Sequence, residues 1–127
     1  VLPKQSVFGV VTEGYLGPAL SKPARVRDIE RYRRELTPVY RAFLHELVRL
    51  LQPGGRAVFS MPRWVDKDGK EHSLLRLRAV LPPGLRVVKP EDTVLQYSPE
   101  ILIYRRPGQY VVRELVRLER KPRSQKP

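Results

Sequence analysis

The sequence predicts an α/β fold in which parallel strands alternate with helices and a final hairpin adds an antiparallel strand. Residues 6–11 form a short apolar run that indicates a strand. Residues 39–51 repeat apolar side chains at the 3.6-residue spacing of a helix. Two further apolar runs, 101–104 and 110–118, flank the turn sequence RRPG and indicate a hairpin. Strands that alternate with helices are typical of a parallel sheet, and the hairpin strand is expected at or near its edge.

The first predicted strand ends in polar residues. Thr12 and Glu13 follow the apolar run directly, Gly14 breaks it, and the aromatic residue Tyr15 comes next. A continuous apolar run is typical of a buried parallel strand, and ligands of open α/β sheets bind outside the carboxyl ends of such strands. These residues therefore stand where an α/β enzyme would keep its chemistry. The alternative is an ordinary strand end, with Thr12 as a cap, Glu13 in solvent and Tyr15 on the rim.

Two helices are predicted between the first and second strands. The first covers residues 27–36, and its apolar residues recur at helical spacing. Thr37 is expected to cap the second helix, with Pro38 at its first position. The apolar face of this second helix consists of Val39, Tyr40, Phe43, Leu44, Leu47, Val48, Leu50 and Leu51. The sequence QPGG at 52–55 predicts where it ends.

The remaining predicted elements are short. A second strand at 56–61 ends before Pro62, Arg63 and Trp64. It is followed by a turn at 67–69, a helix at 74–81 capped by Ser73, and a third strand at 85–88. We place one domain at residues 1–119. Residues 120–127 are basic, contain no apolar anchor, and are predicted to be a disordered tail.

Composition limits the class of protein. The 127 residues suit a single domain, and 41% of them are hydrophobic, which is enough to bury a core. The absence of Cys excludes disulfides and thiolate chemistry. No apolar run approaches the roughly 20 residues that span a bilayer, and the first residues lack a signal-peptide pattern, so we expect a cytoplasmic protein with no membrane partner. Because the sequence begins with Val, we expect it to start inside a longer protein.

The charge balance points to a polyanionic partner. Twenty-five Lys and Arg against 13 Asp and Glu give a net charge of +12, and such an excess attracts nucleic acid above all. A solvated basic surface, or a heat-adapted protein rich in Arg and Pro, is the alternative. His45 and His72 have no neighbours at metal-ligand spacing, so no metal site is expected.

Several segments resemble class I S-adenosylmethionine-dependent methyltransferases. Residues 50–56, LLQPGGR, followed by AVFS, are similar to the segment before that family's fifth strand. Residues 10–17, VVTEGYLG, are similar to its fourth strand and to the catalytic tetrapeptide of amino-directed members, which is usually Asp or Asn, Pro, Pro and an aromatic residue. Only Tyr15 matches that tetrapeptide strictly. With the hairpin arm at 110–116, the chain most resembles the tRNA guanine-N2 methyltransferase group, over residues 6–119.

This resemblance implies a Rossmann-like half-domain that helps to transfer a methyl group to an exocyclic amine, most closely N2 of guanine in tRNA. Thr12 or Glu13, with the carbonyl of Glu13 or Gly14, would accept the N–H bonds of the amine. Glu13 could also take the released proton, and Tyr15 would stack on the extruded base. Gly14 would let the backbone approach the substrate closely. We also predict substrate contacts at Leu16 and Gly17, and at Pro62 and Arg63, which follow the carboxyl end of the second predicted strand. Packing or phosphate contact is the alternative for Pro62 and Arg63.

The resemblance implies S-adenosyl-L-methionine as the cofactor. The family's Gly-rich turn after its first strand is absent from this sequence, so the cofactor-binding residues are unknown. We therefore expect the carboxyl-terminal half of such an enzyme, inactive alone, with an exposed sheet edge that pairs with the missing half or self-associates. A DNA amino-methyltransferase and a basic RNA-binding α/β module without catalysis remain alternatives.

Overall fold

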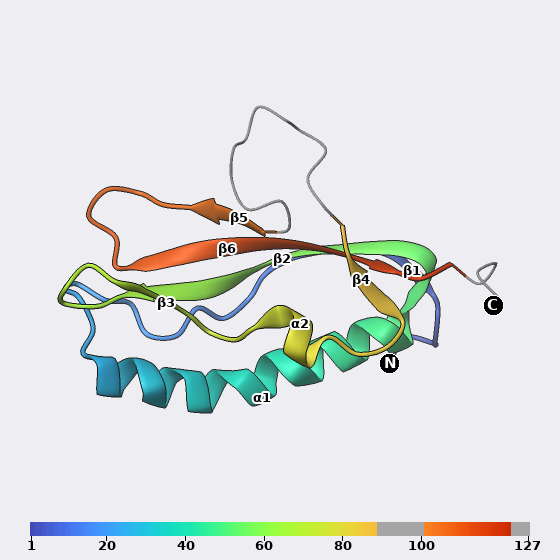
Figure 1. Cartoon of the computed structure of the whole chain (residues 1–127). Coiled ribbons are helices and arrows are strands. Elements are labelled where there is room, and N and C mark those ends of the chain that lie inside the picture. Colours follow the sequence, from blue (N-terminus) through green and yellow to red (C-terminus); the bar gives the residue numbers. More distant parts are fainter. Residues whose placement is uncertain (89–100, 123–127) are drawn as a thin grey trace.

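A computed structural model describes residues 1–88 and 101–122, and their strands form one sheet with a long helix along one face (Figure 1). The sheet has six strands in the described residues. The elements, in chain order, are β1 (Val7–Glu13), α1 (Val26–Leu50), β2 (Leu51–Val65), β3 (Glu71–Ser73), α2 (Leu77–Val80), β4 (Leu85–Val87), β5 (Ile101–Tyr104) and β6 (Val111–Arg120).

The sheet is mixed rather than mainly parallel. Its main order is β1-β2-β6-β4, while β3 pairs with β2 and β5 pairs with β6. Only β1 and β2 run parallel among the described strand pairs, joined by α1, and the other pairs are antiparallel. The predicted α/β class and terminal hairpin are confirmed. The third predicted strand, β4, runs in the same direction as β1 and β2, because β2 and β4 are each antiparallel to β6. The hairpin strand β6 lies inside the sheet, between β2 and β4.

One continuous helix replaces the two that were predicted. α1 runs for 25 residues and contains both Thr37 and Pro38, so Thr37 does not cap a second helix. Pro38 removes one backbone hydrogen bond, which costs a helix interior about 3 kcal/mol. Its ring is exposed, whereas an unbroken stripe of apolar side chains lies buried on the opposite face. Burial of that stripe offsets the cost. It consists of Ile29, Tyr32, Leu36, Tyr40, Leu44 and Leu47.

The core lies between α1 and the central strands β2 and β6. Ala57, Phe59 and Met61 of β2 pair with Leu118, Val116 and Glu114 of β6, and all six are buried. Directly opposed residues share one face of a sheet. The ring of Phe59 meets that of Phe43 from α1 edge-to-face, with centroids 5.1 Å apart. This face is therefore the one that α1 covers.

The short elements differ from prediction in their bounds. β2 continues through Pro62, Arg63 and Trp64 to Val65, because its last residues pair with β3, a strand that was not predicted. Ser73 belongs to β3, and α2 begins at Leu77 without a side-chain cap. The predicted tail begins too early, since Arg120 ends β6 and the Lys121 amide donates to the Gly84 carbonyl at 2.8 Å. Residues 123–127 lie outside the described residues.

β1 is an edge strand and is not buried on both faces as expected. It pairs with β2 on one side, and Phe8 and Val11 are 70% and 85% exposed. An exposed edge of this kind was predicted for a half-sheet. The apolar run of β1 thus leaves much of its hydrophobic surface uncovered in the described chain.

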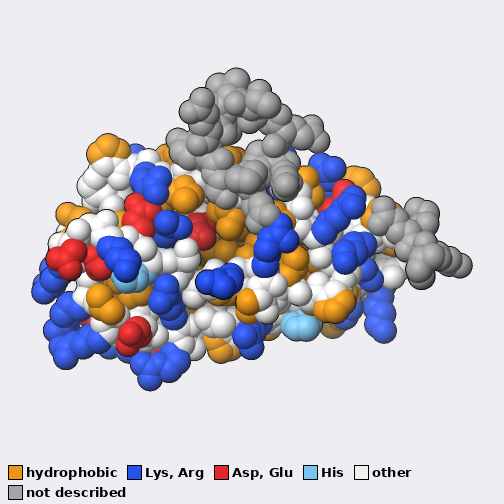
Figure 2. All heavy atoms as spheres, in the orientation of Figure 1, with side chains coloured by type: hydrophobic (Ala, Val, Ile, Leu, Met, Phe, Trp, Pro, Cys, Tyr) orange, Lys and Arg blue, Asp and Glu red, His pale blue; other side chains and the backbone are white. Residues whose placement is uncertain are grey.

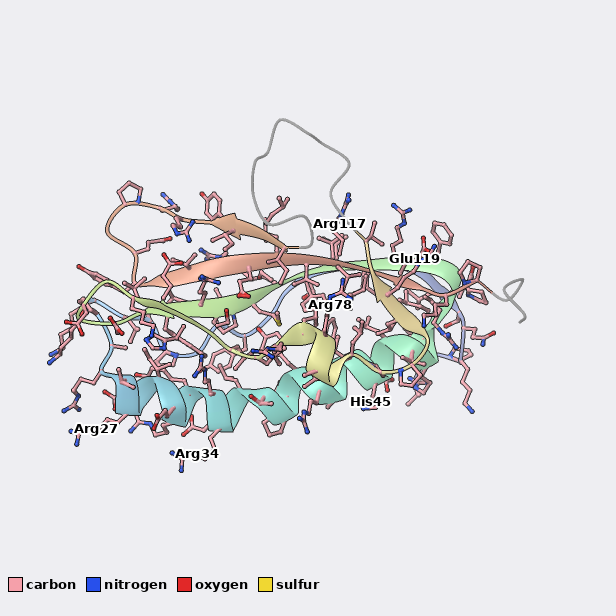
Figure 3. All side chains as sticks on the ribbon, viewed as in Figure 1. Arg27, Arg34, His45, Arg78, Arg117 and Glu119 are labelled. Carbon is pink, nitrogen blue, oxygen red and sulfur yellow. The ribbon has the colours of Figure 1, made fainter. Side chains whose placement is uncertain are left out.

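The molecular surface is strongly basic. Lys and Arg side chains gather over the first turns of α1 (Figure 2). Arg27 and Arg34 project from α1 away from the sheet (Figure 3), and both are exposed. In the described residues, no helix is long and apolar enough to cross a membrane.

Candidate active site

The segment from Thr12 to Tyr15 lies where β1 leaves the sheet. Glu13, the last residue of β1, is opposite Ser60 in the middle of β2. Beyond Glu13 the chain no longer pairs with β2. Thr12, Glu13 and Tyr15 are all exposed, and the Tyr15 side chain is 64% exposed. The segment therefore combines a fixed strand end with accessible polar and aromatic side chains.

Tyr40 of α1 fixes the backbone of this segment. Its buried hydroxyl donates a hydrogen bond to the Tyr15 carbonyl at 2.8 Å and lies 3.3 Å from the Ser60 carbonyl oxygen. Burial, and secondly the negative charge of Glu13, raises the pKa of Tyr40 to about 12. The hydroxyl consequently stays protonated and remains a donor at physiological pH.

Gly14 is required by the same contact. A Cβ atom at this position would lie 2.2 Å from the Tyr40 hydroxyl oxygen and 2.7 Å from the Ser60 carbonyl oxygen. From the sequence, we expected Gly14 to let a substrate approach the backbone closely. In the structure, the nearest neighbours of Gly14 are Tyr40 and β2. Gly14 lets helix α1 reach the strand end.

Glu13 is held by an arginine from the centre of the sheet. The Arg113 Nε atom of β6 donates to Glu13 Oε1 at 2.6 Å. The Glu13 side chain is 55% exposed, so the carboxylate keeps access to solvent and to ligands. Sequence reasoning did not identify Tyr40 or Arg113 as site residues. The only signal for Arg113 was its place in the predicted hairpin, 100 positions from Glu13.

Two hollows border the segment. Thr12, Gly14 and Tyr15 line a small one of about 210 Å³, together with side chains of α1 and β2: Val39, Tyr40, Phe43 and Phe59. Leu16 and Gly17 line a second of about 300 Å³, closed by the β5–β6 turn and Arg113. Arg113 lines the second hollow and also binds Glu13, whose side chain lines neither hollow.

Pro62 and Arg63 do not join this segment. The Pro62 side chain is buried within the protein and is not open to solvent. Arg63 belongs to a different pocket, between the sheet, α1 and β3, whose lining includes none of residues 12–17. The structure thus brings together Thr12 to Gly17 and leaves the other two predicted substrate contacts apart from them.

The site offers acceptors and a flat ring, but no described residues suited to a metal. Thr12 Oγ1 and the Glu13 carboxylate are accessible oxygen acceptors, and the Tyr15 ring is an exposed stacking surface. The described ranges 1–88 and 101–122 contain no cluster of His, Asp and Glu able to hold a metal ion. Chemically, the segment can accept hydrogen bonds from N–H groups, receive a proton at Glu13 and stack against a planar ring.

Comparisons with known proteins give a fold but no family. No family model matches the sequence, and no curated protein matches it significantly. A crystal structure of a protein from Thermus thermophilus, provisionally named a DNA modification methylase, superposes with a TM-score of 0.52 at 21% identity, covering 99% of this chain and 50% of that one. This likeness shows that the two chains share a fold.

Two further crystal structures of the Thermus protein are also similar. Its selenomethionine derivative gives a TM-score of 0.48 at 23% identity, with 99% of this chain and 51% of that one covered. Its complex with S-adenosyl-L-methionine gives 0.45 at 25% identity, with 99% and 52% covered. This chain therefore spans about half the length of the solved structures that it resembles.

Proposed function

We propose that this chain is the amine-binding half of an S-adenosyl-L-methionine-dependent methyltransferase that modifies an exocyclic amino group of a nucleobase. The observation that carries the proposal is the geometry at the end of β1. Accessible acceptors at Thr12 and Glu13 and an exposed aromatic ring at Tyr15 stand on a backbone anchored by Tyr40. The shared fold with a protein named a DNA modification methylase supports the same class of enzyme.

The residues of this chain would act on the target amine. Thr12 Oγ1 or the Glu13 carboxylate accepts a hydrogen bond from one N–H group of the amine, and the carbonyl of Glu13 or Gly14 accepts one from the other, which turns the nitrogen lone pair toward the methyl donor. The Tyr15 ring stacks on the flipped base and holds its plane. Once the nitrogen has gained the methyl group, it gives up one proton, and Glu13 is placed to receive it and pass it to solvent. Arg113 keeps the carboxylate in position by its ion pair.

The described residues do not fit the cofactor itself. S-adenosyl-L-methionine supplies a methyl group on a sulfonium when bound, but this chain has no Gly-rich turn between a strand and a helix to hold it. We assign the cofactor-binding residues to another part of a longer protein. The uncovered edge of β1, with Phe8 and Val11 exposed, is the surface on which that part would continue the sheet.

Two nucleic acids are candidate substrates. The resemblance of residues 10–17 and 110–116 to the tRNA guanine-N2 group favours guanine in tRNA. The name of the Thermus protein favours an amino group in DNA. The net charge of +12 suits either polyanion.

The test measures methyl transfer from labelled S-adenosyl-L-methionine by the full-length protein that carries this chain. Unmodified tRNA and duplex DNA are supplied separately, and the methylated nucleoside is identified by mass spectrometry. We expect a methylated exocyclic amine in one of the two. Tight binding of both nucleic acids without transfer would instead establish a non-catalytic binding module.

A further inference from the structure

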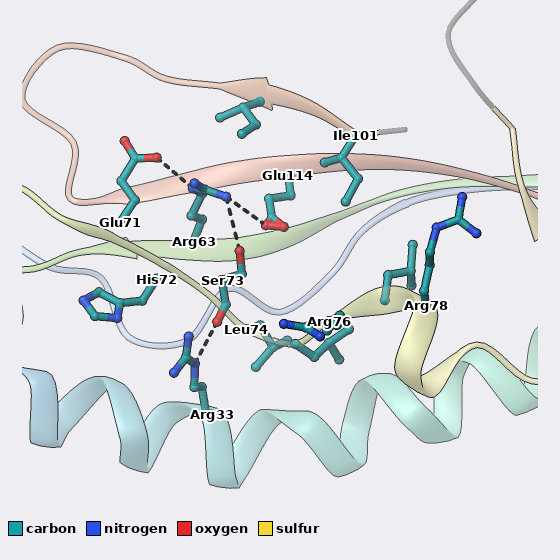
Figure 4. A pocket seen from close by; sticks show the side chains of 13 residues that line it. Arg33, Arg63, Glu71, His72, Ser73, Leu74, Arg76, Arg78, Ile101 and Glu114 are labelled. Carbon is teal, nitrogen blue, oxygen red and sulfur yellow. Dashed lines mark hydrogen bonds and ion pairs between the residues drawn. The ribbon is translucent and has the colours of Figure 1, made fainter. Parts of the chain in front are cut away.

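A pocket of about 740 Å³ lies away from the candidate active site. It is lined by residues of the sheet, α1 and the β3–α2 segment (Figure 4). This volume falls within the range of roughly 300–1,000 Å³ that is usual for small-molecule sites. None of Thr12 to Gly17 lines it, so a ligand here would not occupy the space proposed for the target amine.

Arginines dominate the charge of this pocket. Arg33, Arg63, Arg76 and Arg78 line it, against Glu71 and Glu114. The Glu71 carboxylate is already bound by two guanidinium groups, Arg63 at 2.7 Å and Arg105 at 2.7 Å. These two hydrogen bonds, the one from Arg105 first, hold the pKa of Glu71 down at about 2. Arg105, which does not line the pocket, thus offsets the charge of Glu71, and the lining arginines outnumber the remaining carboxylate of Glu114.

Two of the arginines are held in place through one serine. The Arg33 Nε atom donates to the Ser73 carbonyl at 2.7 Å, and Arg63 Nη1 donates to Ser73 Oγ at 3.2 Å. Arg63 also lies 3.7 Å from the buried Glu114 carboxylate. These contacts leave the terminal nitrogens of Arg33 and Nη2 of Arg63 without a partner in the described chain. Preorganised guanidinium groups of this kind suit the oxygens of a phosphate.

Arg76 adds an unpaired charge to the lining of the pocket. Its side chain is exposed, and within residues 1–88 and 101–122 it makes no hydrogen bond or ion pair. An unpaired guanidinium beside two anchored ones can close on a bound anion without breaking an internal contact.

Aliphatic side chains also line the pocket. Leu74 and Leu77 from the β3–α2 segment are buried, and Ile101 and Ile103 of β5 are half-buried. Inorganic phosphate gains nothing from such side chains, whereas a planar heterocycle or a sugar buries apolar surface against them. Arginines and aliphatic side chains in one pocket match a molecule that has an anionic group and a flat apolar part.

We propose that this pocket binds a single nucleotide, with its phosphate on Arg33, Arg63 and Arg76 and its base against the aliphatic side chains of Leu74, Leu77, Ile101 and Ile103. The nucleotide can be free or can be one residue of a nucleic acid strand, because both present the same chemistry. The inference does not rest on the proposed methyltransferase activity and extends beyond it.

Calorimetric titration of the full chain measures how much the phosphate and the base each contribute to the affinity. GMP should bind at least about tenfold more tightly than guanosine, which lacks the phosphate, and than inorganic phosphate, which lacks the base. A short single-stranded oligonucleotide distinguishes the sources: tighter binding of the oligonucleotide identifies a strand residue, and tighter binding of GMP identifies a free nucleotide. Equal affinity for GMP and inorganic phosphate would overturn the proposal in favour of general anion attraction.

Variants locate the site. Arg76→Gln should weaken GMP binding at least about fivefold. Arg34→Gln removes the same charge from the outer face of α1 and should change the affinity less than about twofold. Ile103→Ala should weaken GMP binding while leaving the affinity for inorganic phosphate unchanged. Equal losses for Arg76→Gln and Arg34→Gln would contradict a built site.

Backbone NMR on the unaltered chain gives a result that does not depend on variants. GMP should shift the amide signals of residues 71–78 and 101–103 and leave those of residues 12–17 unchanged. Shifts confined to residues 12–17 would place the nucleotide at the candidate active site and overturn this inference without affecting the proposed function. Failure of methyl transfer, in turn, would leave the NMR result standing.

Discussion

The Tyr40 hydroxyl donates a hydrogen bond to the carbonyl of Tyr15, 25 residues earlier in the chain, at 2.8 Å. This contact fastens the segment after β1 to the middle of α1. The sequence predicted Tyr40 only as a core residue of the helix, and this hydrogen bond gives its hydroxyl group a role. The contact sets the geometry of the candidate active site, and its removal is the most direct test of that geometry.

We expect Tyr40→Phe to lower the free energy of unfolding by about 1 kcal/mol, because it removes one buried hydrogen bond and leaves the Tyr15 carbonyl without this donor. Urea denaturation measures the change. Tyr104→Phe is the matched control, since Tyr104 is 47% exposed and its hydroxyl makes no hydrogen bond in the described part of the chain. Equal stability of Tyr40→Phe and the unaltered chain would show that the contact contributes nothing.

Gly14→Ala should destabilise the fold by about 1–3 kcal/mol, the usual range for forced overpacking. The added methyl group would lie 2.2 Å from the Tyr40 hydroxyl oxygen, so helix and strand must separate. Gly9→Ala is the control on the same strand, because its nearest neighbour would be 3.9 Å away. Thermal denaturation of both variants compares them. A Gly14→Ala protein as stable as Gly9→Ala would mean that the segment is free to move.

Glu13→Gln should lower the rate of methyl transfer by the full-length protein about 100-fold, because it removes the group that receives the amine proton. Its effect on stability should stay below about 1 kcal/mol, since the ion pair with Arg113 is largely exposed. Single-turnover kinetics and urea denaturation measure the two effects. Glu35→Gln, an exposed change on α1, serves as the control. An undiminished rate for Glu13→Gln would remove Glu13 from the proposed chemistry.

Acid should weaken the fold through Glu71. Its folded-state pKa of about 2 lies below the ordinary value of 4.5, chiefly because of the hydrogen bond from Arg105. A depressed carboxyl pKa stabilises the fold fully above the unfolded value and loses that contribution as the pH falls toward the folded value. The stability of the unaltered chain should therefore decline between about pH 4.5 and pH 2, and Glu71→Gln should flatten this part of the curve. An identical pH profile for the variant would contradict the assignment.

Pro38→Ala should stabilise the protein by about 1–3 kcal/mol, because the new amide can complete the hydrogen bonding of α1 at an exposed position. Circular dichroism during urea denaturation measures the gain. A loss of stability would mean that α1 depends on the bend or on the restricted φ angle that Pro38 imposes.

Local sequence patterns predicted the elements whose signals are local. The apolar run of β1, the helical spacing from Val39 to Leu47 and the RRPG turn all lie within short windows, and each element is present. The prediction of two separate helices was wrong because Pro38 destabilises a helix only locally. The stripe of buried apolar side chains that stabilises α1 extends along its whole length. The strand β3 is three residues long and forms because it pairs with β2. This pairing cannot be predicted from the three residues of β3 alone.

The candidate site was predicted in part for the same reason. The strand end at Thr12 to Tyr15 is a sequence signal, and the structure places those residues together with Leu16 and Gly17. The contacts of Arg113 with Glu13 and of Tyr40 with Tyr15 join residues 100 and 25 positions apart. Arg63 was assigned to the site because it follows a strand predicted to end early, whereas β2 carries it onward to the pocket beside β3.

The position of β6 has a consequence for how the protein is made. β6 is the last described strand in the chain, yet it lies beside β2 in the middle of the sheet. During synthesis β1, α1 and β2 emerge before β6, and one long edge of β2 then stays unpaired until about 50 more residues have left the ribosome. We expect nascent chains stalled before residue 111 to be prone to aggregation and to recruit chaperones. Such chains lack β6, an interior strand, and therefore expose the unpaired edge of β2.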